Sequence, residues 1–168
     1  MLLKVGAAPP RGPASALPFS RPGVVFAHEE RSGALARRET AERILLIEDD
    51  FLVAAQIEAA LIEAGFEIAG IGASADEAIE LASSQRPVLC VMDIRLAGAR
   101  DGIEAAVEIF RAHGVRCIFA TAHFDQDART RAEKAAPLGW LQKPFSMASL
   151  VAAVRGAVRE AQGRNRPS

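Results

Sequence analysis

Short apolar runs alternate with segments of helical pattern five times along this chain, and this alternation restricts the fold more than any other feature. The runs cover residues 44–47, 66–72, 88–93, 116–121 and 138–142, and each is too short for a stable helix. Each is followed by a segment expected to be helical, at 52–64, 75–86, 101–114, 125–136 and 146–162. This order predicts an α/β fold, a doubly wound five-stranded parallel sheet with helices on both faces and right-handed connections.

The first 42 residues differ from the rest of the chain. Five of the nine prolines lie there, at positions 9, 10, 13, 18 and 22, and no regular apolar period is sustained. Residues 1–42 are therefore expected to be a flexible Pro/Gly-rich arm, because they bury too little apolar surface to offset their ordering entropy. Residues 43–162 form the predicted domain, and 163–168 are expected to be a disordered tail, too short for an output domain.

The composition argues against several classes of protein. The formal net charge of −1 provides no basic surface for a nucleic-acid partner. No stretch reaches the roughly 18 apolar residues that span a membrane, and the apolar start lacks the unbroken core of a secretory signal. Cys90 and Cys117 lie inside apolar runs, which indicates buried thiols in a reducing compartment. We therefore expect a cytoplasmic protein without nucleic-acid or membrane partners.

Polar residues follow four of the five predicted strands. The first run, "ILLI", leads directly into three acids, which would repel one another unless they are solvated or something positive lies among them. The residues at the four strand ends are Glu48-Asp49-Asp50, Asp93, Thr121 and Lys143. Because sites in doubly wound sheets form at the carboxyl ends of the strands, we expect these side chains to converge.

The convergence of carboxylates, a hydroxyl and an ammonium group indicates a particular chemistry. Carboxylates without a nearby His or Cys suit a hard cation such as Mg²⁺. A carboxylate beside a metal and a lysine can attack phosphorus and form an aspartyl phosphate. Lys143 would neutralise charge on the phosphoryl group, and Thr121 would hydrogen-bond one of its oxygens.

Four motifs carry a resemblance to a known family. They are "ILLIEDD", "VMDIRLAGARDGIEA", "FATAH" and "GWLQKPF", in this order, with Asp93, Thr121 and Lys143 separated by 28 and 22 residues. On these motifs, residues 43–162 resemble the receiver domain of two-component response regulators. The resemblance implies a flavodoxin-like sheet with the strand order 2-1-3-4-5.

The resemblance also implies a role for individual residues. Asp93 resembles the phosphoacceptor, and the implied cofactor is Mg²⁺ alone. The implied metal ligands are Asp49, Asp93, Glu48 and the backbone carbonyl of Arg95. The implied phosphate-binding and switch residues are Thr121, Ala122, Lys143 and Trp140.

Some positions depart from the family pattern. The loop "DIRLAGARDG" is one residue longer than the commonest form, and Ala97 replaces a usual proline. Trp140 stands where Tyr or Phe is usual, and the small Ala122 is expected to leave the phosphoryl site open. Arg95 and His123 resemble positions that tune phosphorylation and dephosphorylation rates. Of the three acids after the first run, Asp50 is expected to be the solvated one that caps the first helix.

The sequence therefore predicts a phospho-accepting response regulator in a two-component phosphorelay. A histidine kinase or phosphotransfer protein would phosphorylate Asp93, and the chain would signal to an unknown downstream effector by protein contact. It would be a signalling switch and not an enzyme, catalysing only its own phosphorylation and dephosphorylation. Two alternatives stay open at this point: a phosphate sink or shuttle in a relay, and a receiver-like binding scaffold that is not phosphorylated.

Overall fold

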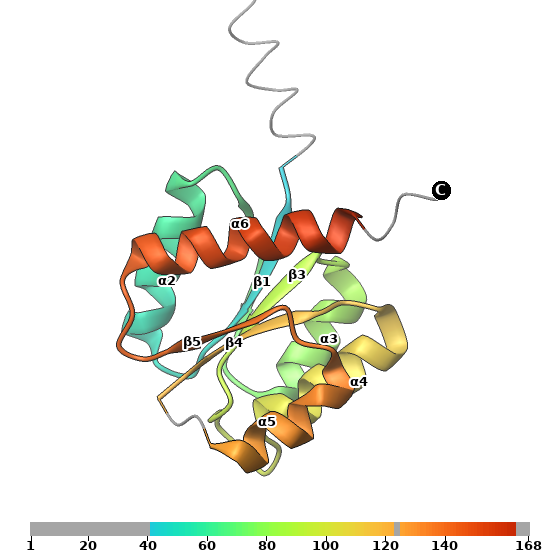
Figure 1. Cartoon of the computed structure of the whole chain (residues 1–168). Coiled ribbons are helices and arrows are strands. Elements are labelled where there is room, and N and C mark those ends of the chain that lie inside the picture. Colours follow the sequence, from blue (N-terminus) through green and yellow to red (C-terminus); the bar gives the residue numbers. More distant parts are fainter. Residues whose placement is uncertain (1–40, 123–124, 164–168) are drawn as a thin grey trace, which may run out of the picture.

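The computed structural model describes residues 41–122 and 125–163, which form one layered α/β unit (Figure 1). Its strands are β1 (Arg43–Ile47), β2 (Glu67–Gly72), β3 (Leu89–Met92), β4 (Cys117–Thr121) and β5 (Gly139–Gln142). Its helices are α2 (Phe51–Glu63), α3 (Ala75–Gln85), α4 (Gly102–His113), α5 (Gln126–Ala132) and α6 (Met147–Gly163), with a 3₁₀ turn, η1 (Glu133–Ala135), after α5. Each predicted strand and helix is present.

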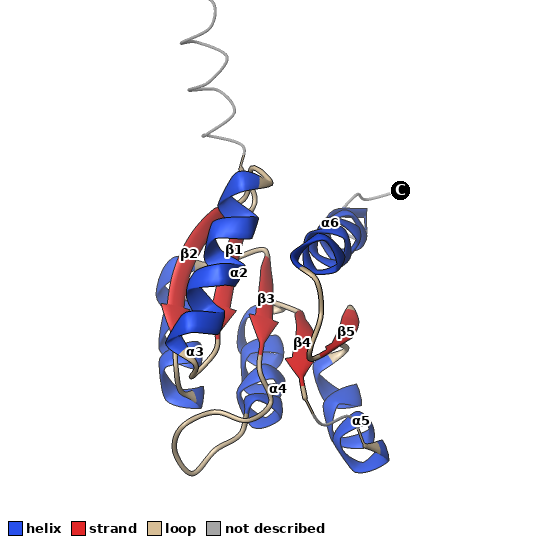
Figure 2. Ribbon diagram, turned by 90° about the vertical axis from the view of Figure 1, so that its left-hand side faces the viewer, coloured by secondary structure: helices blue, strands red, loops and turns tan. Residues whose placement is uncertain are grey.

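The five strands form one parallel sheet in the order β2-β1-β3-β4-β5. This confirms both the predicted fold class and the strand order. Helices α2 and α6 cover one face of the sheet, and α3, α4 and α5 cover the other (Figures 1 and 2). Because all strands run in the same direction, their carboxyl ends lie along one edge, where the polar residues follow them.

Alternate side chains of the three central strands, β1, β3 and β4, enter two separate cores. Leu45, Cys90 and Phe119 pack toward α3, α4 and α5, whereas Leu46 and Val91 pack toward α2 and α6. All five are at most 1% exposed. Strands buried on both faces are typical of parallel sheets, and this accounts for the continuous apolar runs in the sequence.

The helix ends explain where several elements begin and stop. Asp50 caps α2, as predicted, with its carboxylate accepting from the N–H groups of Leu52 at 2.9 Å and Val53 at 3.2 Å. A reciprocal capping box, unpredicted here, joins Asp101 and Glu104 at the start of α4. These side chains satisfy N–H groups that the first helical turn leaves without backbone partners.

The structure differs from the sequence prediction mainly at element boundaries. The segment predicted as one helix at 125–136 is a seven-residue α5 followed by the 3₁₀ turn η1, and Ala136 directly after this turn lies in the left-handed region (φ 46°). Helix α6 ends at Gly163, one residue past the predicted end. The predicted arm and tail lie almost wholly outside the described residues. None of the described helices combines the length and apolar character that a membrane span requires.

Candidate functional site

The candidate site lies at the carboxyl edge of the sheet, where β1, β3, β4 and β5 end. Glu48 follows β1 directly, Asp93 follows β3, Thr121 ends β4, and Lys143 follows β5. Glu48, Asp93 and Thr121 are the three buried polar or charged side chains among the described residues, at 4%, 7% and 1% exposure. Burying such groups costs free energy unless each has a partner, so their partners define the site.

Lys143 connects the carboxylates of two different strand ends. Its Nζ lies 2.5 Å from Oε2 of Glu48 and 2.7 Å from Oδ2 of Asp93. The acids are 95 and 50 residues away in sequence, so only the folded sheet brings the three groups together. This arrangement confirms the predicted convergence and shows what separates the negative charges.

Burial and ion pairing shift the pKa values of Glu48 and Lys143, and the geometry of the site explains both shifts. Desolvation raises the pKa of Glu48, the negative charge of Asp93 adds to that effect, and the hydrogen bond from Lys143 opposes it. Desolvation would lower the pKa of Lys143, but its bonds to Asp93 and Glu48 outweigh this and raise it. Lys143 is therefore held as an ammonium cation at neutral pH.

Three of the predicted metal ligands lie close enough together to hold one ion. Glu48, Asp49 and Asp93 each offer a carboxylate oxygen, and these oxygens lie within 4.8 Å of one another. Asp49 is exposed while the other two are buried, so the group opens toward solvent on one side. An all-oxygen, open set of this kind fits Mg²⁺, which retains several of its water ligands.

The loop after β3 is fixed around Asp93. The N–H of Arg95 donates to Oδ1 of Asp93 at 3.1 Å, so the two oxygens of this carboxylate have different partners. Further along, Ala97 forms an isolated bridge with Ser74, and its N–H donates to the Ala73 carbonyl at 3.3 Å. The loop that is longer than usual is thus attached to the segment before α3. The predicted ligand role of the Arg95 carbonyl stays a prediction.

The β4 and β5 ends carry the other predicted residues. The Lys143 N–H donates to the Thr121 carbonyl at 2.8 Å, so the main chains of these two residues are directly bonded. Ala122 is exposed, in keeping with an open site. Trp140 lies within β5, half-buried, with its ring centroid 4.8 Å from that of Phe119. His123 lies outside the described residues.

Two contacts near the site could not be predicted from the sequence. The bond between Lys143 and Glu48 joins residues of separate motifs, and no spacing in the sequence reveals it. Arg131 of α5 pairs with Asp101, the residue that caps α4. The capping pattern at Asp101 and Glu104 was visible in the sequence, but the partner from α5 was not. The Lys143–Pro144 peptide bond is cis.

The fold and this pocket define a doubly wound α/β protein whose site gathers three carboxylates and one ammonium group at the strand ends. The family model for the response regulator receiver domain matches residues 44–155. The chain belongs to this family of two-component signalling domains. Receiver domains act as signalling switches and not as conventional enzymes.

Similar proteins agree with this assignment. The transcriptional regulatory protein PdtaR of Mycobacterium tuberculosis is 37% identical over 116 residues, which are 69% of this chain and 56% of the relative. The chemotaxis protein CheY of Halobacterium salinarum is 34% identical over 116 residues, 68% of this chain and 94% of the relative. The signal receiver domain of a modulated diguanylate cyclase from Desulfovibrio desulfuricans has a TM-score of 0.69 at 29% identity, covering 74% of this chain and 99% of that one. The chain thus spans about half the length of PdtaR and nearly all of CheY.

Proposed function

We propose that this chain is a response regulator that accepts a phosphoryl group on Asp93 from a histidine kinase or phosphotransfer protein. Phosphorylation depends on Mg²⁺, and the phosphorylated chain signals to an effector by protein contact in the cytoplasm. The observation that carries the proposal is the position of Lys143, whose ammonium group lies 2.7 Å from the Asp93 carboxylate and 2.5 Å from that of Glu48.

The transfer can be written from the groups present. An Asp93 carboxylate oxygen attacks phosphorus, the bond from phosphorus to the donor's imidazole nitrogen breaks, and the electron pair of that bond stays with the imidazole. After the transfer, Lys143 can bind a phosphoryl oxygen in place of the Asp93 carboxylate oxygen that it contacts in this structure. Thr121, at the end of the neighbouring strand, offers a hydroxyl group to the same phosphoryl group.

Glu48, Asp49 and Asp93 would hold the Mg²⁺ ion, and the Arg95 carbonyl is proposed as a further ligand. When bound, the ion neutralises negative charge on the phosphoryl oxygens during transfer. Asp50 is not part of this group of oxygens, and its Oδ1 instead accepts from two N–H groups of α2.

The covalent change would act on the described structure through Thr121 and Trp140. A movement of Thr121 reaches β5 directly, because its carbonyl accepts the Lys143 N–H. Trp140 lies opposite Phe119 on the adjacent strand, two register positions before Thr121 and Gln142, so its side chain is placed to respond. We propose that the surface formed by α5, β5 and α6 changes as a result, as a shift between two populations.

The test is phosphorylation by acetyl phosphate with Mg²⁺, followed by intact mass. Wild type is expected to gain one phosphoryl group, and the gain is expected to be lost in Asp93→Asn and with EDTA. Asp76→Asn, which changes an acid whose side chain is 83% exposed, is the matched control and should be phosphorylated normally. No adduct on wild type, with no response to beryllofluoride, would favour the scaffold that is not phosphorylated. Rapid loss of the adduct without any stable effector complex would favour the sink or shuttle.

A further inference from the structure

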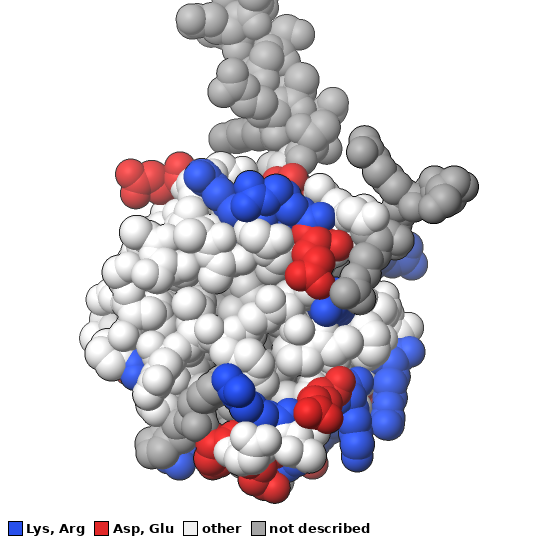
Figure 3. All heavy atoms as spheres, in the orientation of Figure 1, with Lys and Arg blue, Asp and Glu red and all other residues white. Residues whose placement is uncertain are grey.

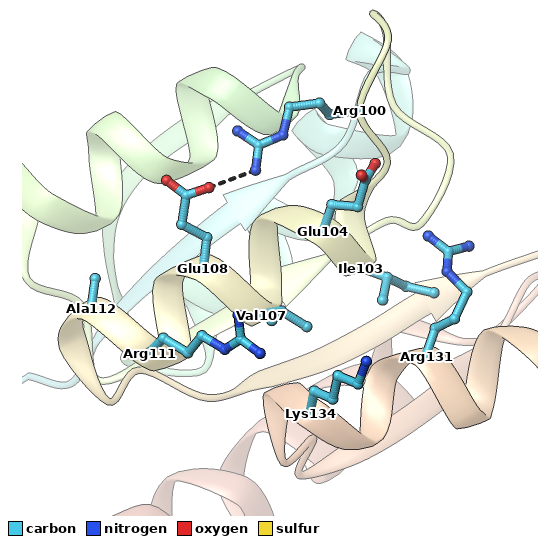
Figure 4. Close-up of a pocket in the computed structure, with 9 residues that line it drawn as sticks. All are labelled: Arg100, Ile103, Glu104, Val107, Glu108, Arg111, Ala112, Arg131 and Lys134. Carbon is cyan, nitrogen blue, oxygen red and sulfur yellow. Dashed lines mark hydrogen bonds and ion pairs between the residues drawn. The ribbon is translucent and has the colours of Figure 1, made fainter.

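A groove with a volume of about 580 Å³ runs between α4 and the segment formed by α5 and η1 (Figure 4). Most of its lining comes from α4, and Arg131 and Lys134 line it from the other side. None of its residues belongs to the carboxylate–lysine pocket described above. The groove is therefore a separate surface feature of the domain.

The bottom of the groove is apolar. Ile103 is 2% exposed and belongs to the core, and Val107, one helical turn further along α4, is half-buried. Ala112 extends this surface toward the end of α4. An aliphatic side chain of a ligand that covers this apolar surface contributes binding free energy through the area it removes from water.

Both carboxylates of the groove are already occupied by contacts within the domain. Oε2 of Glu108 accepts from Arg100 at 2.6 Å (Figure 4). Oε2 of Glu104 accepts the N–H of Asp101 at 2.9 Å as part of the capping box. Each carboxylate thus has one oxygen held by a contact within the domain, and the negative charge of Glu104 adds to the hydrogen bond with Asp101 in raising the pKa of Arg131.

Two of the four cations that line the groove have ion-pair partners within the described domain, and two do not. Arg100 pairs with Asp76 and Glu108, and Arg131 pairs with Asp101. Arg111 and Lys134 make no ion pair with any residue in the described part of the chain. Asp76 and Asp101 balance the charges of Arg100 and Arg131, so the unpaired positive charge of the groove lies on Arg111 and Lys134.

We propose that this groove binds an acidic amphipathic segment of a partner protein. An aliphatic side chain of the segment lies on Val107 and Ala112, and its carboxylates pair with Arg111 and Lys134. A helix with aliphatic and acidic residues three or four positions apart meets both requirements at once. The specificity comes from the charges, and the affinity comes mainly from the apolar contact.

The chain's own N-terminal segment is a poor occupant by charge. Residues 1–40 contain six Lys or Arg and three Glu, so they repel a positive groove on balance. An acidic partner segment is complementary to Arg111 and Lys134. The groove shares α5 with the surface proposed above to change on phosphorylation, but most of its lining comes from α4.

The test uses three synthetic amphipathic helical peptides and the full-length chain. One peptide combines Glu with Leu, the second replaces each Leu by Ser, and the third replaces each Glu by Lys. Binding is measured by fluorescence anisotropy, and the site is located by backbone amide shifts in NMR spectra. The Glu/Leu peptide is expected to shift amides of α4, α5 and η1 and to bind at least tenfold more tightly than the other two.

Matched double variants assign the binding to the groove. Arg111→Glu with Lys134→Glu is expected to weaken binding at least tenfold. Arg155→Glu with Arg159→Glu, which makes the same change of charge on α6, is expected to leave it unchanged. Figure 3 shows the charged side chains of that face in two bands, one along α6 and one around α5, with an uncharged area between them. If a groove variant unfolds, the neutral pair Arg111→Gln with Lys134→Gln replaces it.

Four results would overturn the proposal. Two concern the peptides: equal binding of the Glu/Ser peptide, which would indicate an unspecific anion site, and tight binding of the Lys/Leu peptide. The other two concern the location of the site: loss of binding in the α6 variant, and amide shifts that avoid the groove. Failure of the phosphorylation test leaves these measurements unaffected, since none of them uses acetyl phosphate. The two proposals can therefore fail separately.

Discussion

A Cβ atom on Gly102 would lie 1.9 Å from the carbonyl oxygen of Asp93. The first residue of α4 thus lies directly against the main chain of the proposed phosphoacceptor, and its N–H donates to the Ile94 carbonyl at 2.9 Å. No side chain fits in this contact. The position of Asp93 and the start of α4 are therefore fixed by the same glycine.

Gly102→Ala is expected to destabilise the domain by about 2–3 kcal/mol or more, because the backbone must move to relieve the contact. The measurement is the free energy of unfolding in urea. Gly156→Ala is the control, since a Cβ there meets nothing within 4 Å and the residue lies inside α6. It is expected to stabilise the domain by about 0.5–1 kcal/mol. Equal stability of the two variants would contradict the geometry at Gly102.

Mg²⁺ is expected to stabilise the folded domain through the oxygens of Glu48, Asp49 and Asp93. At about 100 times the dissociation constant, a ligand specific for the native state adds about 2.7 kcal/mol. Asp49→Asn is expected to remove most of this effect, whereas Asp76→Asn retains it. The measurement is the thermal midpoint with Mg²⁺ and with EDTA. An unchanged Mg²⁺ effect in Asp49→Asn would remove that residue from the site.

Lys143→Met is expected to destabilise the domain by about 1–3 kcal/mol at neutral pH, because Glu48 and Asp93 lose their shared cation. Mg²⁺ is expected to restore part of this loss, so the variant depends more strongly on the ion than wild type does. Lys134→Met, at an exposed lysine without an ion pair in the described structure, should stay within about 0.5 kcal/mol of wild type. Urea titrations with and without Mg²⁺ measure both effects.

Stability is expected to fall at alkaline pH through Cys90. The hydrogen bond with Cys117 and complete burial raise the pKa of the Cys90 thiol well above its usual value. Above about pH 8.5 the unfolded chain loses this proton while the folded chain keeps it, so unfolding becomes more favourable by up to about 1.4 kcal/mol per pH unit. Cys90→Ala should show a shallower decline between pH 8 and pH 10, measured in a reducing buffer. Parallel declines would contradict this assignment.

Trp140 provides a direct optical signal, because it is the single tryptophan of the sequence. Its contact with Phe119 gives the ring a defined environment, with 4.8 Å between centroids. Beryllofluoride with Mg²⁺ is expected to change the emission of wild type and to leave Asp93→Asn unchanged. A change of equal size in both would show that the signal arises elsewhere and that Trp140 does not report on Asp93.

Much of the fold was predictable because the strands are buried on both faces. Such strands appear as continuous apolar runs, and the run before Glu48 that forms β1 is an example. The site residues were predictable because each follows a strand directly, so placing the strands also placed Asp93, Thr121 and Lys143. The role of Asp50 followed from capping chemistry alone.

The remaining features depend on contacts between distant segments. Nothing local indicates that Lys143 bonds to Glu48 as well as Asp93, since that depends on how β5 lies relative to β1. The 3₁₀ turn η1 after α5 is followed by a left-handed backbone at Ala136, a conformation that the sequence does not predict because it is unusual for alanine. The groove beside Arg111 and Lys134 required both helices to be in place.

The pocket at the strand ends also has a simple electrical property. Its three carboxylates and one ammonium group leave a formal charge of −2, which a divalent ion cancels and a monovalent ion does not. Before any partner arrives, the resting charge of the pocket is thus set by the free divalent ion concentration around the protein. Readiness to accept a phosphoryl group is, in that sense, partly a property of the surrounding solution.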